Sequence, residues 1–295
     1  MEPTIIKIKI PSQDKRLGRH IHIDSRSANY AFDTTGLTIK DVSHKRLITI
    51  LDQQQLGSCT GNAGIGVINT SPFLGNDKVY TPDEIGAIQL YSDAEKNDGG
   101  AGYPPEDQGS SGLSIAQVLK AKGLISAYYH CYTLNDTLKA MSVFPVIFGT
   151  NWYSDMFNPD SNGELIITGN LSGGHEIELT QVDVENGRVW FDNSWSKTWG
   201  VNGRGYLTWE DFTTLLSQQG DVIVLIPPLL SVGSTGIAVG NLQAKLNTIN
   251  SSQLATDGKF GRLTQAEVVK FQKNNNLVVD GVVGKNTLLA LAKYD

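Results

Sequence analysis

Cys59 stands where a loop rich in Gly and Gln runs into a segment of helical character, residues 52–63. A cysteine at a helix N-terminus can act as a nucleophile, because the helix dipole and the free N–H groups stabilise the reactive thiolate. If Cys59 has this role, the chain must also supply a base, a group that orients the base, and an oxyanion donor. The second cysteine, Cys131, lies in an expected strand, and we interpret it as a small buried hydrophobe. A Cys59–Cys131 disulfide, which would consume the nucleophile, stays open as an alternative.

His175 is the candidate base among the five histidines. It follows Gly173-Gly174 and begins an alternating strand, so its ring can be presented at the mouth of a cleft; an ordinary exposed histidine at a strand end is an equal alternative. Asn193 follows downstream, and its side-chain carbonyl can accept a hydrogen bond from one imidazole nitrogen and fix the ring. Trp195 and Trp199 can shield that hydrogen bond from water, although core packing is the favoured interpretation of either tryptophan alone.

Together these motifs resemble the papain-like cysteine peptidases over residues 35–228. Gln53 precedes Cys59 by six residues, as the oxyanion-hole glutamine of that family does, and the order Cys, His, Asn is the family's. The resemblance implies acyl transfer in which the Cys59 thiolate, paired with protonated His175, attacks a carbonyl. The oxyanion would be held by the Cys59 backbone N–H and the Gln53 side chain, while Asn193 orients His175.

Four positions depart from the family pattern: Thr60, Ser196, Glu176 and Glu178. Glu176 has two interpretations. If it points into the cleft, it raises the pKa of His175 and favours basic or amine-bearing substrates; if it points away, as alternation from His175 indicates, it is only surface.

Residues 1–34 form an N-terminal extension that begins with a strand-like stretch. It is shorter than the usual inhibitory pro-segment of the family, so we do not expect autoinhibition by that route. His20 and His22 are two residues apart, which can indicate a metal site, but a strand face is favoured because no companion Cys/His cluster supports a metal. Residues 107–111 resemble a segment of the bacterial and phage branches of the family.

The elements that must position these residues are helices early in the domain and strands late in it, which indicates an α+β protein. The expected helices are 59–69, weakened by its glycines, one that Thr81 caps with Pro82 and Glu84 in its first turn, 114–122 and 135–141. The expected strands are 127–132, 145–150, 164–168, 176–183, 188–193, 205–209 and 222–226. The resemblance implies a two-lobed fold, with a helical lobe followed by an antiparallel β lobe.

Residues 229–295 contain an internal repeat. The pattern D-G-x-x-G-x-x-T begins at Asp257 and again at Asp280, 23 residues later. Asp-Gly favours a tight turn, and we expect the Thr to cap the next helix. With an earlier helix over 239–246, this predicts a small three-helix domain. The repeat resembles the peptidoglycan-binding domain of bacterial and phage wall enzymes.

Composition limits the partners. The net charge of −6 argues against a general nucleic-acid binder. Residues 229–295 carry seven Lys or Arg against four Asp or Glu, and the remainder 17 against 26, so a tail of charge +3 follows a body of charge −9. Such a tail suits an anionic target such as a bacterial wall; a solvated surface without meaning is an equal alternative. We expect a monomer, with no cofactor, no metal and no membrane insertion.

The leading hypothesis is a wall-targeted cysteine peptidase, of the kind a phage lysin is, that cuts peptidoglycan peptides. No signal peptide is recognised, so we expect synthesis in the cytoplasm and action at the wall after release. One alternative is a protease of protein substrates that docks on the wall. Another is a non-catalytic wall-binding protein that keeps the fold for binding.

Overall fold

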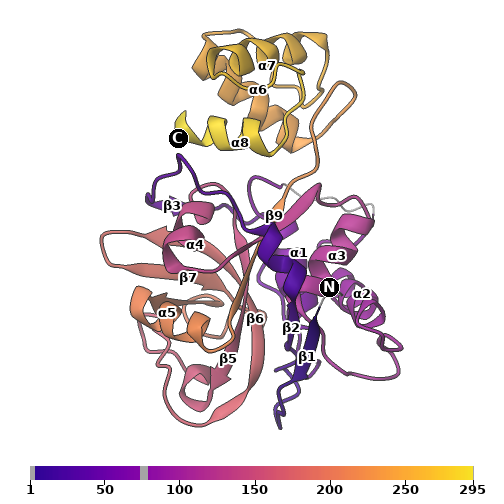
Figure 1. The fold of residues 1–295 in the computed structure, drawn as a ribbon, viewed down its shortest axis with the longest axis vertical. Helices are drawn as coiled ribbons and strands as arrows, with labels where there is room; N and C mark the ends of the chain where they lie inside the picture. The colour runs from indigo at the N-terminus through magenta and orange to yellow at the C-terminus, as the bar shows by residue number, and fades with distance from the viewer. Residues whose placement is uncertain (1–3, 74–78, 295) are drawn as a thin grey trace.

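The computed structural model describes residues 4–73 and 79–294. Figure 1 shows a larger body and, above it, a small helical domain formed by the C-terminal residues. Within the larger body, a group of helices packs on one side and a β lobe lies on the other. The α+β prediction, with its helical lobe, antiparallel β lobe and small helical domain, is confirmed. The limits 1–34, 35–228 and 229–295 stay a prediction.

The helices of the larger body are α1 (Cys59–Ile68), α2 (Glu84–Asn97), α3 (Gly112–Ala121), α4 (Leu134–Met141) and α5 (Trp209–Ser217). The first four, α1 to α4, lie close to their expected positions, whereas α5 was not predicted from the sequence. The expected cap of α2 is wrong, because Asp83 is the N-cap and its carboxylate accepts a hydrogen bond from the Gly86 N–H at 3.0 Å. Asp83 is favoured over Thr81 as the N-cap because a carboxylate at this position also interacts favourably with the helix dipole.

The main sheet has seven antiparallel strands in the order β4-β9-β5-β6-β7-β8, with β3 paired to β6. Their bounds are β3 (Val42–Ser43), β4 (Ala127–Cys131), β5 (Val146–Tyr153), β6 (Leu171–Asp183), β7 (Arg188–Asp192), β8 (Arg204–Thr208) and β9 (Asp221–Ile226). The strand expected over 164–168 is absent, since only Glu164 makes a bridge there, to Tyr206. Asp160 forms a polar turn with the Glu164 N–H just before this stretch, the Leu165 N–H donates to the Tyr206 oxygen at 3.0 Å, and no ladder continues beyond it.

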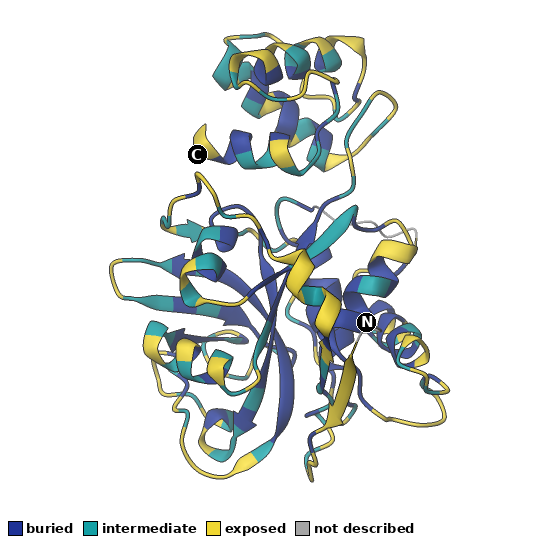
Figure 2. Ribbon diagram, viewed as in Figure 1, coloured by how far each residue is buried: buried dark blue, intermediate teal, exposed yellow. Residues whose placement is uncertain are grey.

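Strand β9 shows why the sheet is covered on both sides. Its side chains alternate: Val222 and Val224 pack into the core of the β lobe, whereas Ile223 and Leu225 pack into the core beneath α1, α2 and α3. Successive side chains of a strand point to opposite faces, so a continuous apolar run fits a strand that is buried on both faces. The buried residues in Figure 2 follow the centre of the sheet in this way.

Glycines let α1 lie close to its neighbours. A Cβ at Gly61 would lie 2.2 Å from the backbone oxygen of Ala87 in α2, and one at Gly66 would lie 2.2 Å from the Glu178 carboxylate on β6. The same residues lower helix propensity, so packing rather than propensity holds α1. That packing fixes the position of the helix start, and therefore of Cys59.

The C-terminal domain consists of α6 (Ile237–Asn250), α7 (Arg262–Asn274) and α8 (Lys285–Leu291). Each Asp-Gly turn is clasped by a glutamine from the preceding helix. Gln272 Nε2 donates to Asp280 Oδ1 at 2.8 Å and to the backbone oxygen of Val282 at 2.9 Å, while its Oε1 accepts from the Gly281 N–H at 2.9 Å. Gln243 clasps the first turn in the same manner.

The predicted role of the repeat threonines is wrong. The N-caps of α7 and α8 are Gly261 and Gly284, with no side-chain cap. Thr264 and Thr287 are buried, and their hydroxyls accept hydrogen bonds from Gln243 and Gln272. The threonines therefore complete the two clasps, because buried amide hydrogens need acceptors.

The N-terminal residues form a hairpin of β1 (Ile5–Lys9) and β2 (His20–Asp24). Lys7 and His22 of this hairpin contact the carboxylate of Asp98 at the end of α2, at 3.1 and 3.4 Å. His22 also contacts Ser111 at 3.2 Å, so it lies in a polar contact with the helical lobe. In the described parts of the chain, no helix has the length and apolarity needed to span a membrane.

Candidate active site

Cys59 is the first residue of α1, as the sequence predicts, and its side chain is completely buried. The loop before it is braced by Asp107, whose carboxylate accepts the Gly57 N–H at 3.1 Å and the Tyr91 hydroxyl at 2.6 Å. Cys59 and Cys131 are both free thiols, and Cys131 is buried. The disulfide alternative is therefore not the arrangement of this structure, and Cys59 stays available as a nucleophile.

His175 lies on β6, and Asn193 follows the end of β7, the neighbouring strand. His175 Nε2 and Asn193 Oδ1 are 2.8 Å apart, in a buried hydrogen bond. The second ring nitrogen, Nδ1, is buried and has no hydrogen-bond partner among the described residues. This arrangement fixes the ring through one nitrogen and leaves the other for a proton-transfer partner.

Aromatic rings enclose the imidazole. The Trp195 and Trp152 rings both lie with their centroids 4.7 Å from that of His175. Trp199 packs on Trp195 at 5.6 Å and so supports the shield indirectly. Trp152, on β5, was not identified from sequence, because an apolar residue in a strand carries no signal of its partner. The enclosure keeps water from the His175–Asn193 hydrogen bond.

Gln53 lies beside the same strand end. Its Oε1 accepts the Ser194 hydroxyl at 2.5 Å, and its backbone N–H donates to the Ser194 oxygen at 2.9 Å. These contacts turn the amide nitrogen away from Ser194, and Nε2 donates to the Arg16 oxygen at 3.0 Å and to the Leu56 oxygen at 2.6 Å. Ser194 therefore positions Gln53. The sequence analysis did not identify this role, although the position of Ser194 next to Asn193 could have indicated it.

The N-terminal extension runs through the cleft between these elements. We call residues 14–20 the cleft segment. Its backbone is held on both walls: the Arg19 N–H donates to the Gly174 oxygen at 3.1 Å, and the Ser110 N–H donates to the Gly18 oxygen at 2.9 Å. The Arg16 guanidinium stacks over Trp195 at 4.3 Å. The expectation of no autoinhibition rested on the length of the extension, and length alone says nothing about where a segment docks.

The cleft segment alters the charge state of the site. Burial raises the pKa of the Cys59 thiol to about 12, helped by the charge of Glu176, although backbone hydrogen bonds from Glu176, Gly18 and Thr60 oppose it. Burial also lowers the pKa of His175 to about 4, although its hydrogen bond with Asn193 opposes this. Both groups are therefore neutral at pH 7 in this covered state, so burial outweighs the helix dipole.

The two glutamates on β6, Glu176 and Glu178, are buried rather than surface residues. Glu178 is buried and forms an ion pair with Arg46, while Glu176 is buried 3.7 Å from the Nε of Arg19. The interpretation of Glu176 as plain surface is wrong, because the cleft segment supplies a buried cation beside it. The apolar residues usual at such positions would leave Arg19 and Arg46 without these partners.

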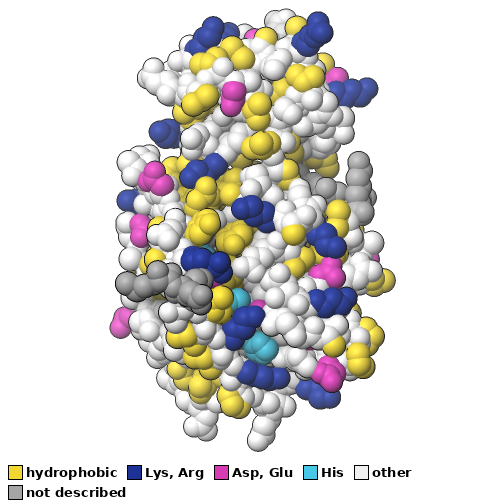
Figure 3. Space-filling model, turned by 45° about the vertical axis from the view of Figure 1, so that its right-hand side comes forward, with side chains coloured by type: hydrophobic (Ala, Val, Ile, Leu, Met, Phe, Trp, Pro, Cys, Tyr) yellow, Lys and Arg dark blue, Asp and Glu magenta, His cyan; other side chains and the backbone are white. Residues whose placement is uncertain are grey.

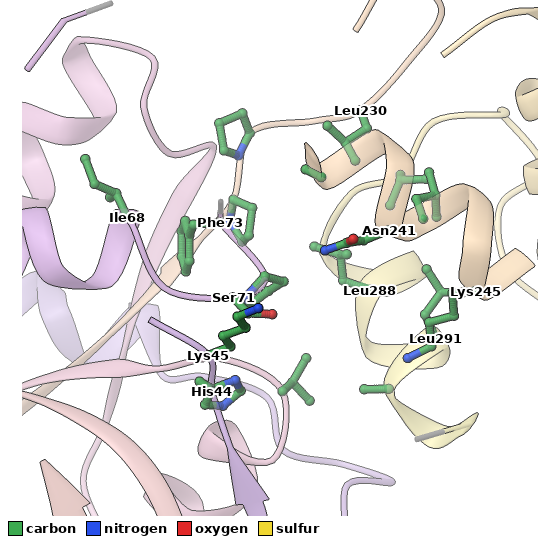
Figure 4. Close-up of a pocket in the computed structure, with 18 of the residues that line it drawn as sticks. His44, Lys45, Ile68, Ser71, Phe73, Leu230, Asn241, Lys245, Leu288 and Leu291 are labelled. Carbon is green, nitrogen blue, oxygen red and sulfur yellow. The ribbon is translucent and has the colours of Figure 1, made fainter. Parts of the chain in front are cut away.

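A cavity of about 740 Å³ lies between the two domains. Figure 4 shows His44, Ser71 and Phe73 on the side of the larger body, facing Asn241 and Leu288 of the C-terminal domain. The residues lining this cavity do not include Cys59, His175, Asn193 or Gln53. The candidate active site and the interdomain cavity are therefore separate.

Cationic side chains do not gather in one patch on the face drawn in Figure 3. Lys and Arg side chains are scattered there over both the larger body and the C-terminal domain. The positive balance of the C-terminal residues is therefore spread out on this face.

Comparison with known proteins identifies both parts of the chain. The structure is similar to xylellain, a cysteine protease from Xylella fastidiosa, with a TM-score of 0.58 and 16% identity over 75% of this chain and 98% of that chain. It also aligns with procathepsin L 3 of Tenebrio molitor, at a TM-score of 0.48 and 14% identity over 66% of this chain and 72% of that one. The xylellain match shows that the larger body has the papain-like cysteine protease fold.

Residues 235–291 match a family model described as a putative peptidoglycan binding domain. A zinc D-Ala-D-Ala carboxypeptidase of Streptomyces albus G is 43% identical over 60 residues, which are 20% of this chain and 24% of that protein. The chain thus spans about a quarter of the length of that curated relative. Both resemblances drawn from the sequence motifs, the papain-like one and the peptidoglycan-binding one, are confirmed.

Proposed function

We propose that this protein is a latent cysteine peptidase that its C-terminal domain targets to the bacterial wall, where it cuts peptide bonds of peptidoglycan. Cys59 is the nucleophile, His175 the general base and acid, Asn193 the orienting residue, and Gln53 an oxyanion donor. The observation that supports this most is the Gln53 side chain, whose amide donates to a backbone carbonyl oxygen of the cleft segment. The same segment contacts the buried Cys59 thiol through Gly18, and a donor that reaches a carbonyl of a chain lying at the thiol is what acyl transfer requires.

The proposed reaction uses these four residues in turn. With the cleft segment displaced, water re-enters and the penalty of burial on charged Cys59 and His175 falls. The thiol passes its proton to His175 Nδ1 and attacks the carbonyl carbon; Gln53 and the Cys59 N–H hold the oxyanion. His175 then protonates the leaving amine, and water hydrolyses the acyl-enzyme. Production in the cytoplasm and release at lysis, as for a phage lysin, fits this activity and remains a prediction.

Opening the cleft is the first step of the test. A Cβ at Gly18 would lie 2.0 Å from the backbone oxygen of Gly57, so Gly18→Ala should push the cleft segment out. We expect iodoacetamide to alkylate Cys59 at least 10-fold faster in Gly18→Ala than in the wild type. Lys15→Ala is the matched control, because Lys15 is exposed on the same segment. Mass spectrometry of the labelled peptides separates Cys59 from Cys131.

Opened enzyme is then incubated with purified sacculi and with casein. We expect soluble peptides and new amines from sacculi, no cleavage of casein, and loss of both products in Gly18→Ala/Cys59→Ala. Gln53→Ala in the opened enzyme should reduce the rate by ~10²–10³-fold. Cleavage of casein without release from sacculi would instead identify a wall-docked protease of proteins, and release that survives Cys59→Ala would refute the catalytic role.

A further inference from the structure

The side chain of Arg19, in the cleft segment, extends into a pocket lined by polar and charged groups. This side chain is completely buried, and its Nη2 donates to the backbone oxygen of Gln219 at 2.7 Å and to the carboxylate of Asp221. Its Nε lies 3.2 Å from Asp221 Oδ1 and 3.7 Å from Glu176 Oε2. The guanidinium is thus held by two carboxylates and one carbonyl, which together recognise a cation with N–H donors.

The pocket exists because two of its wall positions have no side chain. A Cβ at Gly149 would lie 2.4 Å from Arg19 Nε, and one at Gly112 would lie 2.1 Å from Glu176 Oε1. Alanine at Gly149 would therefore close the space that the guanidinium fills, and alanine at Gly112 would displace the carboxylate. The cation site depends on these glycines as well as on its charged residues.

The pocket lies beside the nucleophile. Glu176 directly follows His175 on β6, and a backbone hydrogen bond from Glu176 lowers the pKa of the Cys59 thiol. Gly18, the residue before Arg19, also hydrogen-bonds that thiol through its backbone. A chain lying in this cleft therefore places one residue at the sulfur and the side chain of its neighbour in the pocket.

Two carboxyl groups, those of Glu176 and Asp221, surround the single guanidinium of Arg19. Both carboxylate oxygens of Glu176 and the Nη1 of Arg19 are buried without a hydrogen-bond partner among the described residues. Burial and the charge of Asp221 raise the pKa of Glu176 well above its usual range, although Arg19 opposes this. The Asp221 side chain is 32% exposed, so the pocket opens to solvent at that end. Once Arg19 leaves, a cation that enters from this open end can pair with the same two carboxyl groups.

We infer that the pocket filled by Arg19 is the specificity pocket of the enzyme, and that it takes a cationic side chain of the substrate, such as a lysine or another amine-bearing residue next to the scissile bond. Arg19 then occupies the place of that side chain while the cleft is closed. This inference rests on the proposed peptidase function. Glu176 and Asp221 are the specificity-determining residues, and neither takes part in the acyl transfer itself.

The test compares peptides in the opened enzyme, Gly18→Ala. Acetylated tripeptide amides of aminomethylcoumarin carry lysine, norleucine or glutamate at each of the three positions in turn. At one position we expect kcat/KM to be roughly 10- to 100-fold higher for lysine than for norleucine, the range of a hydrogen bond to a charged group. Glutamate should be the poorest substrate there, because it meets two carboxylates.

Variants identify the residues responsible. Asp221→Asn and Glu176→Gln should each lower the lysine-to-norleucine ratio towards one. Glu178→Gln is the matched control, a buried carboxylate two residues away on the same strand that pairs with Arg46 instead, and it should leave the ratio unchanged. Equal rates for lysine and norleucine at every position, or a ratio that Asp221→Asn and Glu176→Gln do not change, would overturn the inference.

Binding separates this inference from the proposed function. In Gly18→Ala/Cys59→Ala, calorimetry should show that the lysine peptide binds at least 10-fold more tightly than the norleucine peptide. Lysine-selective binding without hydrolysis by the opened enzyme refutes the peptidase and keeps the pocket. Hydrolysis without selectivity keeps the peptidase and refutes the pocket, and absence of lysine-selective binding also counts against the pocket.

Discussion

At the scale of single residues, the site is defined by how each polar atom is used. Asn193 fixes one nitrogen of His175, and Ser194 fixes the side-chain oxygen of Gln53. The second ring nitrogen of His175 and the side-chain nitrogen of Gln53 are therefore left for the cleft. Both positioning contacts are direct hydrogen bonds between side chains. As a consequence, the imidazole of His175 is buried and does not readily take up a proton.

The burial of His175 predicts that the stability of the fold depends on pH. The folded-state pKa of His175, about 4, is below its ordinary value of 6.5 because the ring is buried. The unfolded chain therefore binds the proton first, so this contribution to stability is complete above pH 6.5 and is lost as the pH falls towards 4. At pH 5 the loss amounts to about 2 kcal/mol.

Urea unfolding at pH 7 and pH 5, followed by tryptophan fluorescence, measures this effect in the larger body, where all five tryptophans lie. The wild type should lose about 2 kcal/mol more than His175→Gln, which has no titrating ring. Equal losses in the two proteins would mean that His175 is not held neutral by the fold.

At the scale of elements, periodicity and turn residues predicted most helices and strands. The helix start at Cys59, and the strands that carry His175 and end at Asn193, lay close to their expected positions because each is bounded by Gly or turn residues. The strand expected over 164–168 failed because tertiary pairing, not propensity, decides such short stretches. The contacts of Arg16 and Arg19 could not be predicted, since they join residues up to about 200 positions apart.

The glutamine clasp of the C-terminal domain gives a prediction at this scale. Gln272→Ala removes the donors and the acceptor that hold the second Asp-Gly turn, and it leaves the buried Gly281 N–H unsatisfied. We expect a loss of about 2 kcal/mol in the stability of this domain. Hydrogen exchange followed by mass spectrometry should show faster exchange in α7 and α8 and no change in β6.

Lys273→Ala is the control for this clasp, because its exposed side chain lies next to Gln272 on the same helix. Unchanged exchange in α7 and α8 of the Gln272→Ala protein would show that the turn holds without its glutamine.

At the scale of the whole molecule, the described contacts between the C-terminal domain and the larger body are the apolar packing of Leu288, Leu289 and Ala292 on the β lobe and a few polar contacts. Lys40 Nζ donates to the Ala292 oxygen at 2.8 Å, and the Lys285 ammonium lies 4.4 Å from the ring centroid of Tyr129. Between these contacts lies the interdomain cavity. Interfaces of this kind permit relative domain motion.

Removing both cations should therefore free the C-terminal domain without unfolding either part. We expect Lys40→Ala/Lys285→Ala to show a larger radius of gyration by small-angle scattering, with a free energy of unfolding within about 1 kcal/mol of the wild type. Lys270→Ala, on the exposed surface of α7, is the control. A scattering profile identical to that of the wild type would show that other contacts fix the domain.

The cleft segment has a consequence that concerns concentration. In the proposed function it is an inhibitor joined to its own target, so its effective concentration at the cleft is fixed by the tether and does not fall when the protein is diluted. Further along the chain, after β2, residues 33–41 contain no helix or strand. A single cut there would turn the tethered inhibitor into a separate molecule. The intact chain would then be inactive at every concentration, whereas the cut chain would become active when it is diluted.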